Sequence, residues 1–268
     1  MVIVRLIGGL GNQMFQYACG RRLSIVLHTP LALDLEWLNT SRNLPHEVYG
    51  LAPFTLCPDL TLLPRGPSRK SRRSAQVLTE RSFAVDRRVL TATGHIYLDG
   101  YWQNEAYFAD VADQIRKELA PLHPLAAAPM SLAELVADEG SVSLHVRRTA
   151  YPNSLPPAYY QDAVAEMRRH FDDPRFCVFS DELDWARREL RLPSESVFVD
   201  VLDPSQPWLD LVAMSHCRHH IIANSTFSWW GAWLDPRPEK IVLAPRFWFL
   251  TNRHHQDDFS LPSAWRRV

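Results

Sequence analysis

Residues 141–151 of the chain read SVSLHVRRTAY. Small and apolar residues alternate through Val146, which predicts a buried strand with two arginines at its carboxyl end. Because successive side chains of a strand point to opposite faces, His145 and Arg147 should share one face, and Val146 and Arg148 the other. Ligands of open α/β sheets bind at the carboxyl ends of strands, where a guanidinium suits a phosphate. Arg147 is therefore a candidate ligand-binding residue with His145 in phase with it; the alternative is a surface arginine pair.

The carboxyl half around this stretch alternates regularly between strand and helix patterns. Such alternation predicts a parallel sheet with helices on both faces. The predicted strands lie near 141–147, 175–180, 196–200, 219–223 and 240–244, and the predicted helices near 157–171, 181–191, 206–216 and 226–234.

The amino half opens with a strand–turn–helix pattern. It consists of a strand at 2–7, the glycine-rich sequence GGLGNQ at 8–13 and a helix near 14–27. In such a turn, backbone amides can approach a phosphate or sugar closely, here beside Gly9 and Gly11. Asn12 and Gln13 could read hydroxyls or phosphate oxygens, or simply cap the helix. Met14 stands where the dinucleotide fingerprint has its third glycine, which disfavours a nicotinamide-dependent oxidoreductase.

A second helix start follows the predicted strand at 219–223. Asn224, Ser225 and Thr226 lie between this strand and a tryptophan-rich helix. Hydroxyls and amides at a helix amino terminus form an anion site, although Asn224 or Ser225 could be an ordinary N-cap. We favour a binding role for Ser225 and Thr226, because this strand end should face the same crevice as Arg147. The tryptophans of the helix are expected in the core.

The middle of the amino half is less regular. It is Pro-rich and is followed by a predicted strand at 95–99 and a predicted helix near 104–119. Five basic residues fall between positions 65 and 73 of the segment 64–75. They could contact an anionic partner such as a lipid-linked acceptor or a membrane surface, but we interpret the segment as a solvated, mobile loop.

Several motifs together resemble glycosyltransferase family 11, the alpha-1,2-fucosyltransferases. The motifs are GGLGNQMFQYA at 8–18, GYWQNEAYF at 100–108, HVRR at 145–148, FSDE at 179–182, NSTFSWWGAWL at 224–234 and PSAWRRV at 262–268. The resemblance implies a GT-B-type fold of two Rossmann-like halves with parallel sheets facing a central cleft. It also implies GDP-β-L-fucose as donor, inversion at the sugar carbon, and neither metal nor cofactor. Asp181 would accept hydrogen bonds from a guanine edge or ribose, or act as an N-cap.

The sequence departs from this family at one position. The family usually follows His-x-Arg-Arg with a small residue and an aspartate, and here those positions hold Thr149 and Ala150. The missing carboxylate leaves open a nucleotide-sugar-binding protein without transferase activity.

We expect residues 1–130 to form the acceptor-side domain and residues 131–268 the nucleotide-sugar domain. In the expected mechanism Arg147 and His145 are catalytic. Charge on the departing phosphate is neutralised by Arg147, by Ser225 and Thr226, and by the Gly9–Gln13 turn. The acceptor is a galactoside or oligosaccharide, free or lipid-linked. Nothing in the sequence ranks the candidate bases, which are Asp34, Glu36, Glu47, Asp99 and Glu105.

Composition limits the remaining possibilities. The 29 basic and 30 acidic residues nearly cancel, so no nucleic-acid partner is expected. The four cysteines are scattered, which suggests neither a zinc site nor a disulfide framework. No apolar run reaches the ~18 residues of a membrane span, and a strand pattern begins at Val2. We therefore expect a cytoplasmic protein of bacterial origin, such as an enzyme of O-antigen synthesis.

Overall fold

The computed structural model describes the chain except for residues 41–46, 123–133, 135, 150–153, 201–205 and 251–260. The chain divides into two compact units. The amino unit comprises Met1–Leu122 with Asp257–Leu261, and the carboxyl unit comprises His123–Gln256 with Pro262–Val268.

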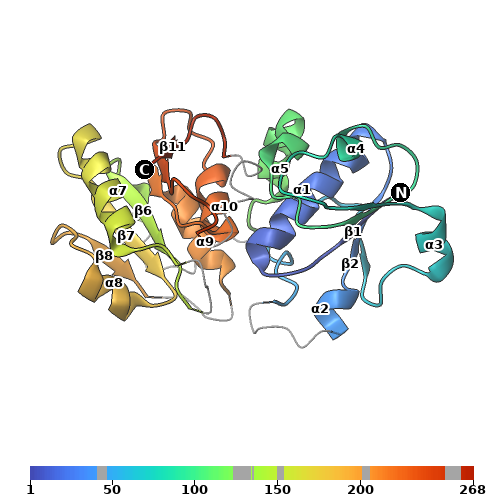
Figure 1. Ribbon diagram of the computed structural model, residues 1–268, viewed down its shortest axis with the longest axis horizontal. Coiled ribbons are helices and arrows are strands. Elements are labelled where there is room, and N and C mark those ends of the chain that lie inside the picture. Colours follow the sequence, from blue (N-terminus) through green and yellow to red (C-terminus); the bar gives the residue numbers. More distant parts are fainter. Residues whose placement is uncertain (41–46, 123–133, 135, 150–153, 201–205, 251–260) are drawn as a thin grey trace. The chain divides into compact units, whose positions relative to one another are not determined.

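The amino unit is built on a parallel sheet of five strands, in the order β3-β2-β1-β5-β4. Figure 1 labels the neighbouring strands β1 and β2 of this sheet. Its strands are β1 (Val2–Arg5), β2 (Leu31–Asp34), β3 (Thr61–Leu63), β4 (Gln76–Thr79) and β5 (Ile96–Asp99). Its helices are α1 (Leu10–Val26), α2 (Glu36–Thr40), α3 (Arg69–Ser74), α4 (Arg87–Leu90), η1 (Glu105–Tyr107), η2 (Ala109–Val111) and α5 (Ala112–Glu118). The helix expected near 104–119 is thus split into two 3₁₀ turns and α5.

The two faces of this sheet are covered differently. Helix α1 packs so closely on one face that a Cβ on Gly20 would lie 2.2 Å from Val4 Cγ2. The opposite face carries Ile3, Ala32 and Tyr97, which form a small cluster with the partly buried Leu63 and Ala75. The expectation of an irregular middle segment is wrong in part, because β3, α3 and β4 lie there. Both strands are short edge strands with mostly exposed residues, so they lack the apolar alternation that marks a strand.

The carboxyl unit has a second parallel sheet, ordered β11-β10-β9-β6-β7-β8. Its strands are β6 (Ser141–Val146), β7 (Arg175–Ser180), β8 (Val197–Val199), β9 (His219–Ile221), β10 (Val242–Ala244) and β11 (Arg266–Arg267). Its helices are α7 (Pro157–His170), α8 (Leu183–Glu189), α9 (Trp208–His216) and α10 (Thr226–Leu234). The predicted alternation of strands and helices is confirmed here, and so is the pair of parallel-sheet α/β halves.

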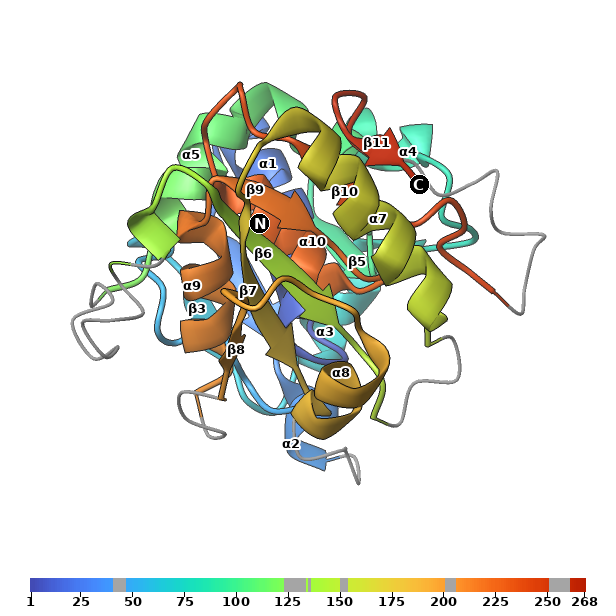
Figure 2. The same cartoon turned by 90° about the vertical axis from the view of Figure 1, so that its left-hand side faces the viewer.

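Helices cover both faces of the second sheet, with α7 and α8 on one side and α9 on the other (Figure 2). The larger core lies under α7 and α8, where Val142, Leu144 and Val146 pack against Tyr160 and Met167. Trp229, Trp230 and Trp233 of α10 are at most 2% exposed, which confirms that these side chains belong to the core.

A buried polar network joins α10 to the face of the sheet that lies opposite α7 and α8. Ser143 Oγ lies 2.8 Å from His220 Nδ1, and His220 Nε2 lies 3.1 Å from Asp235 Oδ2. Arg237 Nε donates to Asp235 Oδ1 at 2.7 Å. Because Ser143 and His220 are in register on neighbouring strands, this chain of contacts fixes the end of α10 against β6 and β9. Burial lowers the pKa of His220 and outweighs the opposing effect of Asp235.

Candidate functional site

Three of the predicted site segments meet at the carboxyl edge of the second sheet. Strand β6 lies between β7 and β9, with Val146 opposite Ser180. The residues after β6 therefore lie beside those after β7, and α10 begins beyond the end of β9. The sequence predicts that Arg147, Asp181 and Ser225 lie at this edge, and the structure places the segments that contain them there.

The Arg147 guanidinium and the Asp181 carboxylate form an ion pair, with Nη1 and Oδ2 2.9 Å apart. Asp181 also accepts the backbone N–H of Arg148 at 2.9 Å and that of Thr149 at 3.0 Å. The two side chains remain 29% and 20% exposed, so the pair is still open to a ligand. Asp181 thus holds the turn after β6, a role that sequence reasoning did not assign to it.

Arg148 points to the opposite face, as the strand pattern predicts. Its guanidinium carbon lies 3.9 Å from the centre of the Trp185 ring in α8. Its Nε lies 3.6 Å from Glu182 Oε2, a weak ion pair. Trp185 and Glu182 are contacts that sequence reasoning missed, although Glu182 ends the FSDE motif and Trp185 lies three residues beyond it. These contacts engage the Arg148 side chain in local packing. Ala150 lies outside the described residues.

His145 is 6% exposed and packs against Phe227 in the first turn of α10, with ring centres 5.7 Å apart. Burial lowers the pKa of His145 to about 3, and the neighbouring Arg147 charge adds to this effect. The imidazole is therefore neutral near pH 7. Its Nδ1 is buried and has no hydrogen-bond partner in the described part of the chain. A neutral ring can contact a ligand but has no extra proton to give at that pH.

The Asn224–Thr226 segment shows the capping geometry that its sequence allows. Ser225 Oγ accepts the backbone N–H of Phe227 at 3.3 Å, so Ser225 is the N-cap of α10. Asn224 is fully buried, and its Nδ2 donates to the carbonyl of Trp248 at 2.9 Å. Thr226 is the first residue of the helix. The cap orients the amino end of α10 beside His145.

In the amino unit, the glycine-rich turn is shorter than expected. Gly8 adopts a positive φ of 74°, Gly9 is the N-cap, and α1 begins at Leu10 rather than near residue 14. Gly11, Asn12 and Gln13 therefore belong to the first turn of the helix. The helix forms early because Leu10, Gly11 and Gln13 are buried, and burial outweighs the weak helix propensity of glycine and asparagine.

The Gln13 side chain is engaged in local structure. Its Nε2 donates to the carbonyls of Gly8 at 2.8 Å and Val48 at 2.7 Å, and its Oε1 accepts the N–H of Gly50 at 2.9 Å. Gln13 thus ties the glycine turn to the Val48–Gly50 segment. Both N–H groups of the amide are used, so a phosphate oxygen could bind Gln13 Nε2 only by replacing one of these bonds.

Asn12 contacts a residue that sequence reasoning missed. Gln103 Nε2 donates to Asn12 Oδ1 at 2.9 Å. The preceding Trp102 is fully buried and has a φ of 57°, a backbone conformation that non-glycine residues rarely adopt. Glu80 holds this conformation by accepting the backbone N–H groups of Tyr101 and Trp102 at 2.7 and 2.9 Å. In the sequence, only the GYWQNEAYF motif at 100–108 drew attention to Trp102 and Gln103.

Two of the five candidate bases are held in contacts of their own. Asp34 is buried, and its carboxylate accepts the Tyr97 hydroxyl at 2.7 Å and the Glu36 N–H at 2.9 Å. Asp99 pairs with Arg5 at 2.9 Å. Asp34 and Asp99 thus have structural contacts. No contact among the described residues favours one of Glu36, Glu47 and Glu105 over the other two as the catalytic base.

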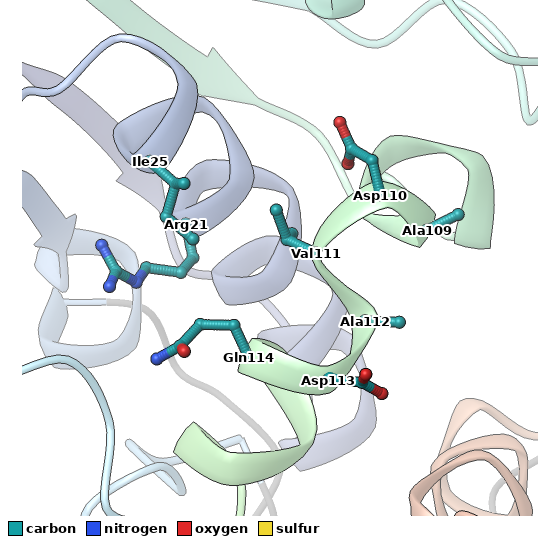
Figure 3. Close-up of a pocket in the computed structure, with 8 residues that line it drawn as sticks. All are labelled: Arg21, Ile25, Ala109, Asp110, Val111, Ala112, Asp113 and Gln114. Carbon is teal, nitrogen blue, oxygen red and sulfur yellow. The ribbon is translucent and has the colours of Figure 1, made fainter.

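A surface pocket of about 670 Å³ lies between α1 and the η2–α5 segment and contains none of the predicted site residues (Figure 3). Arg21 borders it and pairs with the buried Glu118, their Nη2 and Oε1 atoms being 2.8 Å apart. Within the described residues there is no group of three or more metal-ligating side chains. In the same part of the chain, no helix has the length and apolar character to cross a membrane.

Comparison with known proteins identifies the class. A model described as Glycosyl transferase family 11 matches residues 74–266. The Alpha-1,2-colitosyltransferase of Escherichia coli is 29% identical, covering 100% of this chain and 99% of that protein. The O-antigen biosynthesis glycosyltransferase WbnK of Escherichia coli is 28% identical over 92% of this chain and 94% of its own length. Galactoside alpha-(1,2)-fucosyltransferase 1 of Aotus azarae is 26% identical over 85% of this chain and 63% of its own.

Among solved structures, the fucosyltransferase NodZ from Bradyrhizobium matches with a TM-score of 0.56 at 13% identity, covering 88% of this chain and 92% of that one. This likeness concerns the fold and confirms a GT-B-type architecture. The protein is a glycosyltransferase. The chain belongs to glycosyl transferase family 11, which confirms the family resemblance of its motifs.

Proposed function

We propose that this glycosyltransferase is an inverting alpha-1,2-fucosyltransferase that moves L-fucose from GDP-β-L-fucose to a hydroxyl of a galactoside acceptor. The observation that carries the proposal is the Arg147 guanidinium, fixed by Asp181 at a sheet edge and still partly exposed. Support also comes from galactoside alpha-(1,2)-fucosyltransferase 1, which is 26% identical. We further propose that residues 131–268 form the nucleotide-sugar domain of a cytoplasmic enzyme.

In the proposed step the acceptor oxygen attacks the anomeric carbon of fucose while the bond from that carbon to the β-phosphate oxygen breaks. GDP leaves with the bonding electron pair, and the acceptor proton passes to a base that is not assigned. Arg147 offsets the charge that grows on the β-phosphate, as do the hydroxyls and amides of Ser225 and Thr226. A fixed guanidinium is suited to this task because it needs no rearrangement as charge develops.

His145 acts as a neutral group in this proposal. Its Nδ1 would contact the bound nucleotide sugar, since this buried atom has no partner within the described residues. The Gly9–Asn12 stretch, with Gln13 positioning it, is proposed as a further binding segment. Asn224 and Asp181 are proposed to position the site. Asn224 hydrogen-bonds the backbone at Trp248, and Asp181 holds the Arg148 N–H and the Arg147 guanidinium.

GDP-colitose is a second candidate for the donor substrate. The chain is 29% identical to an alpha-1,2-colitosyltransferase along its whole length, and colitose is fucose without its 3-hydroxyl group. A site that hydrogen-bonds a hydroxyl rejects an analogue lacking it by about 10⁴- to 10⁵-fold, whereas a site without that contact discriminates weakly. The ratio of kcat/KM for GDP-fucose and GDP-colitose therefore decides between the two donors.

The second function kept open is nucleotide-sugar binding without transfer, because Ala150 stands where the family has an aspartate. The deciding experiment is an assay of labelled GDP-fucose and GDP-colitose with a panel of β-galactosides, with and without a chelator. Linkage analysis of the product should show an alpha-1,2 bond, formed equally well with chelator. A requirement for a divalent ion would contradict the proposed mechanism. Tight GDP-fucose binding without transfer to any galactoside would favour the binding function.

A further inference from the structure

The segment around α3 carries the densest positive charge of the sequence. Five cations fall between Arg65 and Arg73, and no acidic residue occurs from position 60 to position 79. The structure shows a defined helix here instead of the expected loop. Ser68 caps it by accepting the N–H of Ser71 at 3.1 Å, and none of its residues is buried. The charge is therefore carried on an ordered, exposed helix at the periphery of the amino unit (Figure 1).

Four of these cations have no carboxylate partner among the residues that the structure describes. Arg65, Arg69, Lys70 and Arg73 are exposed and form no ion pair with any described residue. Two carboxylates face Gly66 near the start of the segment, where a Cβ would lie 2.8 Å from Glu36 Oε2 and 3.1 Å from Asp34 Oδ1. Neither carboxylate forms an ion pair with a cation of α3 in the part of the chain that the structure describes. An uncompensated cluster of this kind produces a local positive potential although the whole chain has a formal charge of −1.

The fifth cation fixes the helix to the amino unit. The guanidinium of Arg72 lies 4.9 Å from the centre of the Tyr97 ring, and Ser74 Oγ lies 3.2 Å from His95 Nδ1. Helix α3 thus covers the sheet face that carries Tyr97. Val77 is in register with Tyr97 on the neighbouring strand and therefore shares this face, where it is 45% exposed. The surface combines fixed positive charge with an exposed apolar side chain.

This combination suits an anionic bilayer better than a nucleic acid. Single-stranded nucleic acids stack their bases on exposed aromatic rings, and Tyr97, the aromatic residue of this face, is fully buried beneath Arg72. Anionic phospholipids require only basic side chains near the surface, each worth about 1 kcal/mol, which corresponds to about fivefold in affinity.

We propose that α3 and the residues beside it, Arg65–Ser74 with Val77, form a docking surface for an anionic phospholipid bilayer. The contact is peripheral and electrostatic, and it is independent of the transferase reaction proposed above. It would hold the amino unit at a membrane surface at low ionic strength and release it as salt rises.

The test is co-sedimentation of the full chain with vesicles of equal parts phosphatidylcholine and phosphatidylglycerol. The parent protein should bind these vesicles, should not bind pure phosphatidylcholine, and should dissociate with added salt. Arg69→Glu with Arg73→Glu should weaken binding by about 25-fold or more, because two attractive charges are lost. The matched control is Arg188→Glu with Arg191→Glu, which changes the net charge equally at two exposed arginines of the carboxyl unit.

Thermal unfolding of both double variants verifies that they fold. Equal loss of binding in the two double variants would overturn the proposal, because only total charge would then matter. Parental binding by the α3 variant would also overturn it. So would tighter binding to a single-stranded oligonucleotide than to the anionic vesicles at equal phosphate concentration.

Discussion

The Asp181 carboxylate contacts the Arg147 guanidinium at 2.9 Å and, at the same time, the backbone N–H groups of Arg148 and Thr149. One side chain from the end of β7 thus fixes both the side chain and the backbone at the end of β6. A guanidinium held in this way loses little freedom when it binds a phosphate, so more of the contact energy is available to the transition state.

Asp181→Asn should lower turnover while leaving the fold intact. The amide can still accept a backbone N–H, but the charged contact to Arg147 is lost. A hydrogen bond to a charged group is worth about 1.5–3 kcal/mol, and solvent exposure reduces this, so we expect a fall of about tenfold to a hundredfold in kcat/KM for GDP-fucose. The control is Asp184→Asn, whose side chain is 89% exposed. Parental kinetics in Asp181→Asn would show that the pair does not orient Arg147.

Arg147→Ala should be the most damaging single change. Loss of a contact that strengthens in the transition state costs about 3–4 kcal/mol, or about 100- to 1000-fold in rate. Arg147→Lys should recover part of the lost rate because it keeps the positive charge. Recovery should be incomplete because lysine lacks the paired N–H donors of the guanidinium. Arg148→Ala provides the comparison: it removes the Trp185 stack and should lower the melting temperature more than the turnover. Near-normal turnover in a folded Arg147→Ala protein would refute the assignment.

Ala150→Asp should change the rate little. Arg147 already has a carboxylate partner in Asp181, so an orienting aspartate at position 150 would duplicate an existing contact. The measurement is kcat of the variant and of the parent under saturating donor. A general base contributes about 100- to 10,000-fold. A gain above about a hundredfold would therefore identify position 150 as the missing base.

The carboxyl unit was largely predictable because its signals are local. The alternation in residues 141–146 predicted a buried strand and placed Arg148 on the opposite face from Arg147, since the two faces of a strand follow from a period of two. The strand–helix rhythm likewise predicted a parallel sheet. The capping role of Ser225 was one of two readings of a single motif, and only the Phe227 contact establishes it.

The amino unit was less predictable because its contacts join distant residues. Asn12 and Gln103 are 91 positions apart, and no local pattern in either segment predicts that the two side chains meet. The positive φ of Trp102 contradicts local preference and depends on Glu80, which comes from a different strand end. The edge strands β3 and β4 have too few buried residues to leave a pattern.

The Asn12–Gln103 contact can be measured with a double-mutant cycle. Asn12→Ala, Gln103→Ala and the double variant should show a coupling free energy of about 0.5–1.5 kcal/mol in urea unfolding, the usual net value of a hydrogen bond. If the proposed binding segment is correct, each single variant should also raise KM for GDP-fucose. Additive stability changes would mean that the two amides do not interact in solution.

The pH dependence of stability tests the environment of His145. Burial lowers its pKa to about 3 in the folded protein, whereas an unfolded histidine titrates near ~6.5. The unfolded state therefore binds the extra proton first, and the stability due to this group is lost as pH falls from about 6.5 towards 3.

Between pH ~6.5 and ~4.5 this single group should lower the free energy of unfolding by about 2 kcal/mol. His145→Asn removes that contribution, so its stability should decline less steeply over this interval, whatever its stability at neutral pH. Burial also lowers the pKa values of His219 and His220, and these two residues account for a remaining slope shared by both proteins. Urea unfolding at several pH values measures the two slopes. Identical slopes would mean that the imidazole of His145 is reached by water and can be protonated in the folded state, which would also restore it as a candidate proton donor in the reaction.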